Sequence, residues 1–249
     1  MNFVVLTIFP EMIDPFLDNG MIRLAAERGI IDARAMNIRD FADGKHRVTD
    51  DKPYGGGCGM VMKPEPLSRA IHAASEVAPK AKRILMTPQG RPFDQAMAQE
   101  FAASDGLIFI CGRYEGVDER ICLDQVDEEV SIGDYVMTGG ELASMVVIDA
   151  VTRLLPGVLG GEESAEKDSF SGGLLEHAHY TRPYDFGGAC VPDVLMSGNH
   201  AKIESWRRET SLIRTFLKRP DLLEHRRFSP EEKKVLTEWC RKVEELVGE

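Results

Sequence analysis

The sequence predicts an α/β protein with a mostly parallel sheet, because strand-like and helix-like segments alternate over residues 1–160. The clearest strand is 106–112, GLIFICG, an apolar run between glycines that is typical of a strand buried on both faces of a sheet. The clearest helix is 141–157, which carries apolar residues at helical spacing and ends in Pro156 and Gly157. A hydrophobic content of 43% and a charged content of 29% are ordinary for a globular chain.

The segments before residue 90 already alternate between the two kinds of element. The apolar stretches 2–9 and 30–38 predict strands, and the helix expected between them, 21–29, ends on a glycine. The stretch 64–78 predicts a helix with proline in its first turn. Proline is tolerated there because the N–H groups of the first turn make no hydrogen bond within the helix. A short apolar run at 83–87 predicts the next strand.

The alternation continues to residue 157. A helix is expected at 91–104, with a proline early in it, and the strand 106–112 follows. A short helix at 117–124 leads into a strand at 125–133, and the amphipathic helix 141–157 ends the series. Parallel strands joined by helices bind ligands in the loops at their carboxyl ends.

The composition changes after this helix. Residues 156–183 are rich in glycine, serine and acidic residues and show no periodicity, which predicts a linker. Two amphipathic helices are expected at 200–220 and 229–247, and the second begins with a capping box of Ser229 and Glu232. The expected division is a first domain over 1–160, a flexible linker over 161–173 and a small all-helical domain over 174–249.

Charge is distributed unevenly along the chain. The net charge of −11, taken alone, argues against a nucleic-acid partner. Residues 200–234, however, hold 10 Lys and Arg against 6 Asp and Glu. A local basic patch is sufficient to hold phosphates, so an RNA partner for the second half of the chain stays open.

The cysteines and the N-terminus indicate a cytoplasmic protein. The five cysteines are widely spaced and form no C-x-x-C pair, which fits a reducing compartment and predicts neither a zinc site nor a disulfide framework. No apolar run approaches 18 residues, and the N-terminus lacks the basic segment of a signal peptide. We therefore expect no membrane span.

Four glycine-containing loops follow predicted strands, at 53–60, 87–92, 111–120 and 132–141. No G-x-G-x-x-G follows the first strand and no P-loop motif occurs, so ordinary dinucleotide and nucleoside-triphosphate sites are excluded. Loops rich in glycine but poor in basic residues suit an adenine-containing ligand with little phosphate, such as S-adenosylmethionine. Asp134 or Glu115 would meet its positive charge. The alternative is ordinary turn chemistry, with Tyr135 as a packed structural residue.

Seven motifs occur along the chain in a fixed order: DKPYGGGCGM, LMTPQGRPFDQ, CGRYEGVDER, EEVSIGDYVMTGGELASMVVIDAVTRLLPGVLG, SAEKDSF, HYTRP and VPDVLMSGNH. Together they resemble the bacterial tRNA (guanine-N1)-methyltransferases, a family of the knotted SPOUT superfamily of RNA methyltransferases. The resemblance covers essentially the whole chain. The combination of GRYEGVDER with SIGDYVMTGGE is its most specific part.

The resemblance implies a deep trefoil knot in the C-terminal part of the α/β domain and a homodimer whose active sites are shared between subunits. It implies S-adenosylmethionine as methyl donor and, as substrate, the guanine immediately 3′ to the anticodon of a tRNA. It places the cofactor against Thr87, Pro88, Gly90, Gly112, Arg113, Tyr114, Glu115, Gly116, Ile132, Gly133, Asp134, Tyr135, Val136, Met137, Gly139 and Gly140.

The implied reaction needs a base, since the ring N1 of neutral guanine carries a proton. A general base must remove that proton, and a cation should stabilise the charge that develops on O6. The resemblance assigns the first role to Asp168 and the second to Arg153. Each has a plain alternative: Asp168 as a solvated linker acid, and Arg153 as a cation favoured at a helix C-terminus.

Basic side chains of the helix 200–220 are the expected phosphate contacts, namely Arg207, Arg208, Arg214, Lys218 and Arg219. Trp206 in the same helix either stacks on a base or belongs to a core. His177 and His179 form an H-x-H pair with no evident third ligand, so no metal centre is expected. Mg²⁺ brought by RNA would find the carboxylates of Glu163, Glu166 and Asp168.

Two other functions fit parts of the pattern. One is a non-catalytic RNA-binding or ligand-sensing protein with the same fold, and the other is a knotted enzyme that acts on ribosomal RNA. The presence of both Arg153 and Asp168 disfavours the first. The basic helical second half favours a tRNA-sized partner over the second.

Overall fold

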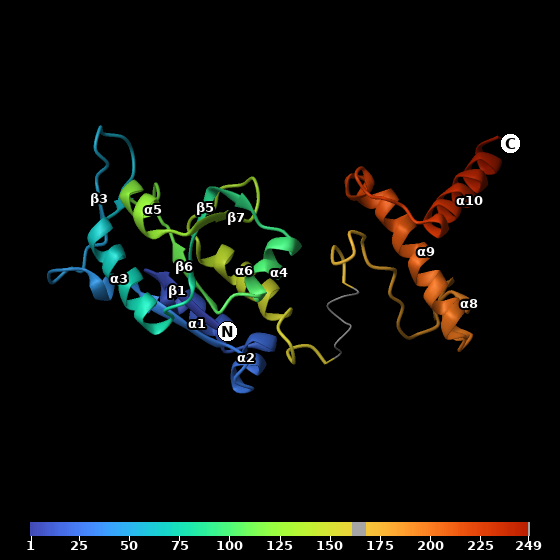
Figure 1. The fold of residues 1–249 in the computed structure, drawn as a ribbon, viewed down its shortest axis with the longest axis horizontal. Helices are drawn as coiled ribbons and strands as arrows, with labels where there is room; N and C mark the ends of the chain where they lie inside the picture. The colour runs from blue at the N-terminus through green and yellow to red at the C-terminus, as the bar shows by residue number, and fades with distance from the viewer. Residues whose placement is uncertain (161–167, 249) are drawn as a thin grey trace. The chain divides into compact units, whose positions relative to one another are not determined.

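The computed structural model describes residues 1–160 and 168–248, which belong to two compact units, Met1–Glu162 and Glu163–Glu249. The first unit contains a five-stranded sheet with helices on both faces, and the second contains the long C-terminal helices (Figure 1). Among the described residues, no helix combines the length and the apolar character needed to cross a bilayer.

The main sheet has the strand order β2-β1-β6-β5-β7. Its strands are β1 (Asn2–Thr7), β2 (Asp32–Asn37), β5 (Lys82–Pro92), β6 (Gly106–Cys111) and β7 (Glu128–Ser131). Every neighbouring pair is parallel, which confirms the predicted α/β class. All of β6 is buried, as its apolar run predicted. The chain passes from β6 over β5 to β7, which brings the carboxyl ends of these three strands together.

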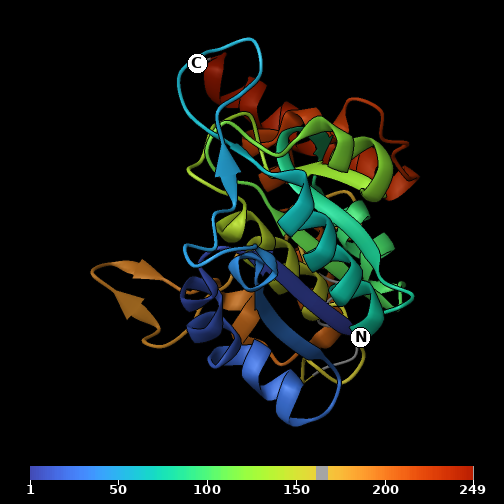
Figure 2. The same cartoon turned by 90° about the vertical axis from the view of Figure 1, so that its left-hand side faces the viewer.

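Helices cover both faces of this sheet (Figure 2). One face carries α1 (Pro10–Leu17), α2 (Gly20–Glu27), α4 (Gln95–Ala102) and α6 (Glu141–Thr152). The other carries α3 (Pro64–Val77), α5 (Glu119–Gln125) and the 3₁₀ helix η1 (Ile38–Phe41). Phe109 is buried against the first layer and its neighbour Ile110 against the second, because successive strand residues point to opposite faces.

Helices α1 and α4 differ from the sequence-based expectation. Helix α1 was missed because Pro10 and Pro15 both fall in eight residues, which usually marks a break. Pro10 occupies the first helical position, where proline is tolerated. Helix α4 starts four residues later than expected, since Pro92 is the last residue of β5 and the Asp94 side chain caps the helix by accepting from the Met97 N–H.

Helix α6 is shorter and more apolar than expected. It ends at Thr152, whereas the predicted end was Pro156–Gly157. It is not amphipathic in the usual sense, because its outward face presents Leu142 and Val146, which are 54% and 46% exposed. A helix with apolar residues on its outer face as well as its buried face offers an apolar surface for a partner.

The loop 53–60 was expected at the carboxyl end of a parallel strand, and this expectation is wrong. The loop joins β3 (Asp50–Asp51) to β4 (Val61–Met62), an antiparallel pair outside the main sheet. Tyr54 in this loop is fully exposed. Its glycines signalled a hairpin connection, which sequence alone does not distinguish from a ligand loop.

The second unit consists of α8 (Asp193–Met196), α9 (His200–Lys218), the 3₁₀ helix η2 (Pro220–Leu223) and α10 (Pro230–Val247), together with a small hairpin of β8 (Asp185–Phe186) and β9 (Ala189–Cys190). The two long helices confirm the prediction, but the expectation of an all-helical domain is wrong. Gly187 and Gly188 form the two-residue turn with φ of 62° and 90°. Adjacent glycines at positive φ are a typical signal of such a hairpin.

The segment that carries Asp168 is fastened to the helices of its own unit. Leu175 donates its N–H to the Thr215 hydroxyl at 2.9 Å. The Arg226 guanidinium donates to the Gly172 carbonyl at 2.7 Å and to Glu232 at 2.8 Å. Arg226, which would otherwise count among the free basic residues of 200–234, is therefore a structural residue.

Helix α10 begins with the predicted capping box. Ser229 donates its N–H to the Glu232 carboxylate at 2.8 Å, and its hydroxyl accepts from the Glu232 N–H at 3.2 Å. Both bonds satisfy groups that the first turn of a helix leaves without partners.

Replacing Ser229 by alanine removes one of these bonds. We expect Ser229→Ala to lower the free energy of unfolding of the second unit by about 1 kcal/mol. Both tryptophans of the chain, Trp206 and Trp239, lie in this unit, so their fluorescence in urea reports its unfolding alone. Ser205→Ala, in an exposed position of α9, is the matched control and should be neutral or slightly stabilising. Equal destabilisation by both variants would contradict the role of the cap.

Candidate functional site

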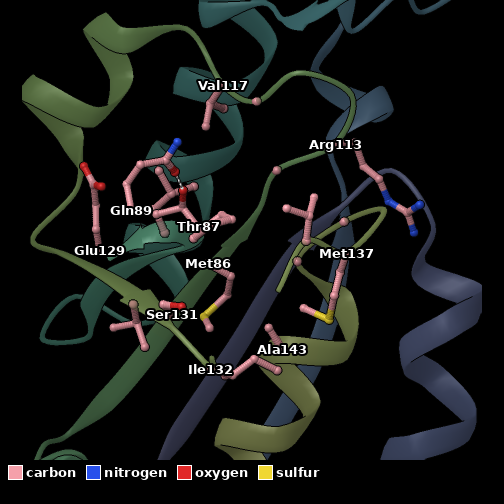
Figure 3. A pocket seen from close by; sticks show the side chains of 18 of the residues that line it. Met86, Thr87, Gln89, Arg113, Val117, Glu129, Ser131, Ile132, Met137 and Ala143 are labelled. Atoms are coloured by element: carbon pink, nitrogen blue, oxygen red, sulfur yellow. Dashed lines mark hydrogen bonds between the residues drawn. The ribbon is translucent and has the colours of Figure 1, made fainter. Parts of the chain in front are cut away.

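A cavity of about 580 Å³ lies at the carboxyl ends of β5, β6 and β7 (Figure 3). This edge of an open α/β sheet is where such folds bind ligands. The cavity is lined by residues 85–89, 112–117, 129–133 and 135–140, together with Glu119, Cys122 and Ala143. Three of the four expected loops therefore form one site, and the loop 53–60 does not line it.

The first wall is a bulge in β5. The strand was expected to end near residue 87, but it continues to Pro92 with a shift in register, because Met86 and Arg91 both pair with Val130. Residues 87–90 thereby leave the ladder. A Cβ added to Gly90 would lie 2.3 Å from the Val130 nitrogen, so this glycine permits close approach of two backbones.

The second wall is the turn that follows β6. Tyr114 has φ of +61°, a left-handed conformation that costs a non-glycine residue about 1–2 kcal/mol. Bonds from the neighbouring hairpin hold this turn: Glu115 donates its N–H to the Met60 carbonyl at 3.0 Å, and the Gly116 carbonyl accepts from the Met62 N–H at 2.9 Å. A non-glycine residue that its surroundings hold in a left-handed conformation typically marks a functional turn.

The third wall, residues 132–140, is joined to the second by a buried ion pair. The Arg113 guanidinium contacts the Glu141 carboxylate at 3.0 Å, and the side chains are 14% and 1% exposed. The Glu141 carboxylate also accepts from the Thr7 hydroxyl at 2.6 Å, at the end of β1. The Arg113 guanidinium lies over the Phe9 ring, 4.6 Å from its centroid. Glu141, for which the sequence analysis predicted no role although it ends the motif SIGDYVMTGGE, is thus bonded to two distant segments.

Two glycines allow the walls to meet. A Cβ at Gly139 would lie 2.2 Å from Arg113 Nε, and one at Gly140 would lie 2.9 Å from the backbone of Cys111. Gly140 donates its N–H to the Gly112 carbonyl at 3.1 Å. The mixture of glycine and apolar residues in this loop therefore has two causes, since the glycines serve close packing and the exposed Val136 faces the cavity.

The cavity is acidic. Three carboxylates line it, from Glu115, Glu119 and Glu129, and the one arginine in its wall is Arg113. Figure 3 shows the Arg113 side chain extending away from Thr87 and Gln89, and its charge is neutralised by Glu141. Such a site disfavours a phosphate-rich ligand and favours a cationic one.

The thiol in the cavity wall is not a nucleophile. Burial raises the pKa of Cys122, and the nearby carboxylates of Glu119 and Glu129 raise it further. Cys111, fully buried at the end of β6, has its pKa raised by burial as well. Both side chains stay protonated near neutral pH, and the protonated thiol is unreactive.

Most residues predicted to bind the cofactor lie around this one cavity, and the exceptions are Gly90 and Asp134. Gly90 serves the contact with β7 described above, and Asp134 is exposed outside the lining. The sequence analysis did not assign the remaining lining residues, although all of them lie in or beside the predicted loops. These are Leu85, Met86, Gln89, Val117, Glu119, Cys122, Glu129, Val130, Ser131, Thr138 and Ala143.

The two predicted catalytic residues belong to different units. Arg153 follows the last turn of α6 in the first unit and is exposed. Asp168 lies in the second unit, where it is half-buried in the wall of a cavity of about 760 Å³. Asp168 is the first described residue after the gap, and Glu163 and Glu166 lie outside the described residues.

The predicted RNA contacts lie on α9 and directly after it, in different environments. Arg207, Arg208 and Lys218 are exposed, whereas Arg214 is half-buried. The Arg219 guanidinium is held by the Asp221 carboxylate, at 2.9 Å and 2.7 Å, which raises the pKa of the arginine. Arg207 and Arg208 are held less tightly, at 3.8 Å and 3.7 Å from Glu204.

The H-x-H pair has a third neighbour that the sequence analysis missed. Ligand atoms of Glu176, His177 and His179 all lie within 4.8 Å of one another, and His179 Nε2 is 2.9 Å from a Glu176 oxygen. Three such donors are compatible with a metal ion, although an ion pair and ring contacts account for the same arrangement.

The fold and the cavity define a class before any comparison: an α/β protein with an acidic, glycine-walled cavity at the carboxyl ends of its strands, suited to a cationic ligand. Residues 1–225 match the family described as tRNA (Guanine-1)-methyltransferase TrmD. A tRNA (guanine-N(1)-)-methyltransferase of Desulfatibacillum aliphaticivorans is 54% identical over 247 residues, which cover 99% of this chain and 94% of that protein. One of Geotalea uraniireducens is 55% identical, over 97% of this chain and 98% of that protein. The chain therefore belongs to the tRNA (guanine-N1)-methyltransferase family.

The buried pair gives a direct prediction. Glu141→Ala leaves the Arg113 guanidinium buried without its carboxylate and should lower the free energy of unfolding of the first unit by about 3–5 kcal/mol. Glu27→Ala is the matched control, because it removes an exposed ion pair with Arg23 and should change stability little. Urea unfolding followed by circular dichroism measures both. If the two variants unfold alike, the pair does not anchor the site.

Proposed function

We propose that this chain transfers a methyl group from S-adenosylmethionine to N1 of the guanine immediately 3′ to the anticodon of a tRNA. Family membership supports the reaction, and the acidic cavity at the ends of β5, β6 and β7 supports the cofactor. The three carboxylates that line this cavity are the single observation that carries the assignment of a cationic methyl donor.

The residues of the cavity fit S-adenosylmethionine. Apolar side chains of Ile132, Val136 and Met137 would hold the adenosine moiety, and backbone groups of 112–116 would bond it without phosphate-binding cations. Glu115 and Glu129 would balance the charge of the sulfonium and amino groups. When bound, the sulfonium supplies an activated methyl group, so the transfer itself needs no metal.

Asp168 and Arg153 are the proposed catalytic residues. The Asp168 carboxylate takes the proton from guanine N1, which frees the lone pair that attacks the methyl carbon. The Arg153 guanidinium donates to O6, where negative charge grows as the proton leaves. Arg153 belongs to the first unit of the chain and Asp168 to the second.

The remaining features of the family complete the proposal. The first unit would carry the deep trefoil knot, with domains at 1–160 and 174–249, and residues 161–167 of the predicted linker lie outside the described residues. Phosphates would contact α9, above all through Arg207, Arg208 and Lys218, which are exposed and, unlike Arg219, are not held at hydrogen-bond distance by a carboxylate of the described residues. Mg²⁺ that accompanies the RNA would be met by acidic residues near Asp168. A cytoplasmic location follows from a tRNA substrate.

The reaction is tested by its product. The full-length protein, S-adenosylmethionine with a labelled methyl group and an unmodified tRNA transcript should give N1-methylguanosine, identified by mass spectrometry of the nucleosides. A transcript with adenine in place of the target guanine should give none. Methylation of ribosomal RNA fragments instead would identify a different knotted enzyme, and no transfer to any RNA would identify a binding protein.

The general base gives the sharpest kinetic prediction. Asp168→Asn should lower the single-turnover rate of methyl transfer by about 10²–10⁴, the usual contribution of a general base. Affinity for S-adenosylmethionine and for tRNA should change little. Arg153→Ala should slow the same step, and the double variant should lose less than the product of the two effects because both residues serve one transition state. A wild-type rate in Asp168→Asn would show that Asp168 is not the general base.

A homodimer with shared sites gives another prediction. The exposed Leu142 and Val146 on α6 supply an apolar surface that a second copy of the chain would cover. Light scattering should report twice the chain mass of 27.7 kDa. Leu142→Glu should shift the mass toward that of one chain and lower activity, whereas Leu123→Glu, at an exposed position of α5, should do neither. A fully active monomer would contradict the shared site.

A further inference from the structure

Four aromatic rings lie together in the second unit, a group we call the ring cluster: His177, His179, Tyr180 and Trp206. The centroids of His177 and His179 are 4.5 Å apart. Trp206 lies 6.4 Å from His177 and 6.1 Å from Tyr180, and each of these contacts is tilted. The rings thus form a continuous aromatic surface contributed by the segment 174–183 and by helix α9.

The ring cluster is open to solvent, and the chain just before it is bonded to helix α9. Tyr180 is 50% exposed, and the His179 side chain is 64% exposed. The segment before it is clamped to α9, because Leu175 donates to Thr215 and Ser211 donates to the Leu175 carbonyl. Exposed rings can contact a ligand, and rings next to a bonded segment lose little conformational freedom when the ligand binds. Both properties suit a preformed binding surface.

The surroundings of the ring cluster distinguish stacking from phosphate binding. His177 shares a cavity of about 760 Å³ with Asp168, Arg207 and Arg208. Glu204 is within 4 Å of both arginines, so their charge is partly balanced. Sites for single-stranded nucleic acid combine aromatic faces for the bases with cations for the phosphates, so the rings would take bases and the exposed arginines beside them phosphates.

We propose that the ring cluster is a stacking surface for unstacked bases of single-stranded RNA. Its exposed rings are Tyr180, supported by Trp206, and His179, supported by His177. The inference rests on the proposed function, since a tRNA offers such bases in its anticodon loop. Aromatic side chains are the usual partners of bases that are splayed out of single-stranded loops. The site accordingly distinguishes a loop from a duplex, and the cavity wall that contains Asp168 adjoins it.

The competing explanation is a metal site. Glu176, His177 and His179 bring three donor atoms within 4.8 Å, a set that a Zn²⁺ ion accepts. The 2.9 Å contact between His179 and Glu176 already satisfies two of these donors. Tyr180 and Trp206 would have no role in such a site, whereas stacking uses all four rings.

The test compares three variants of the full-length protein in binding to an unmodified tRNA transcript. Tyr180→Leu removes a ring, Tyr180→Phe keeps it, and Tyr184→Leu removes a ring of similar exposure, 46%, outside the ring cluster. Loss of one base–aromatic stack corresponds to a rise in Kd of about 5- to 150-fold. We expect this rise for Tyr180→Leu alone. Because no phosphate contact is lost, the slope of log K against log salt should stay unchanged.

A coupling experiment identifies the partner base. One abasic nucleotide at a time is introduced into the anticodon loop. At one position the wild-type protein should lose the same factor as Tyr180→Leu, and the variant should lose nothing more there. Equal weakening by Tyr180→Leu and Tyr184→Leu, or full additivity at every abasic position, would overturn the inference. So would a Co²⁺ absorption band that His177→Ala abolishes, combined with loss of tRNA binding in EDTA, since this would establish the metal site.

Methylation measured in parallel separates this inference from the proposed function. A wild-type protein that forms N1-methylguanosine while Tyr180→Leu binds tRNA normally would refute the stacking surface alone. A wild-type protein that binds RNA through Tyr180 but forms no methylated nucleoside would refute the proposed reaction and leave the stacking surface established.

Discussion

The buried ion pair between Arg113 and Glu141 is the interaction on which the site depends. Its carboxylate is 1% exposed and accepts from Thr7, so it joins the end of β1 to the turn after β6 and to the start of α6. A charge buried this deeply is tolerated because the Arg113 guanidinium and the Thr7 hydroxyl both donate to the carboxylate. The pair also explains why Gly139 must lack a side chain, since a Cβ there would meet Arg113 Nε at 2.2 Å.

The same pair sets the electrostatics of the cavity. By neutralising the arginine in its wall, it leaves Glu115, Glu119 and Glu129 as the dominant charges. A pocket that binds nucleotides through phosphate shows the opposite balance. The second unit presents a different surface, with exposed arginines on α9 and aromatic rings beside them, which suits RNA. The acidic net charge of the chain is therefore an average over an acidic cavity in the first unit and a surface with exposed arginines in the second.

Local patterns predicted the parts of this protein that local interactions determine. The apolar run of β6 and the capping box of α10 depend on neighbouring residues and were read correctly. Thr7 and Glu141 are 134 residues apart, and Glu141 has the ordinary position of an acid at a helix start, so no sequence pattern revealed their bond. The contact of Glu176 with His179 was hidden for a similar reason, because it depends on how an irregular segment folds back on itself. The assignments of Asp168 and Arg153 rest on family resemblance and remain predictions.

Hydrogen–deuterium exchange with and without S-adenosylmethionine tests the central claim, that the acidic cavity is the cofactor site. Backbone amides of residues 112–116 and 132–140 should exchange more slowly when the ligand is present, because their N–H groups and turns become ordered around it. The β8–β9 hairpin of the second unit should exchange at an unchanged rate. Protection confined to segments outside the cavity walls, or no protection at saturating ligand, would contradict the account.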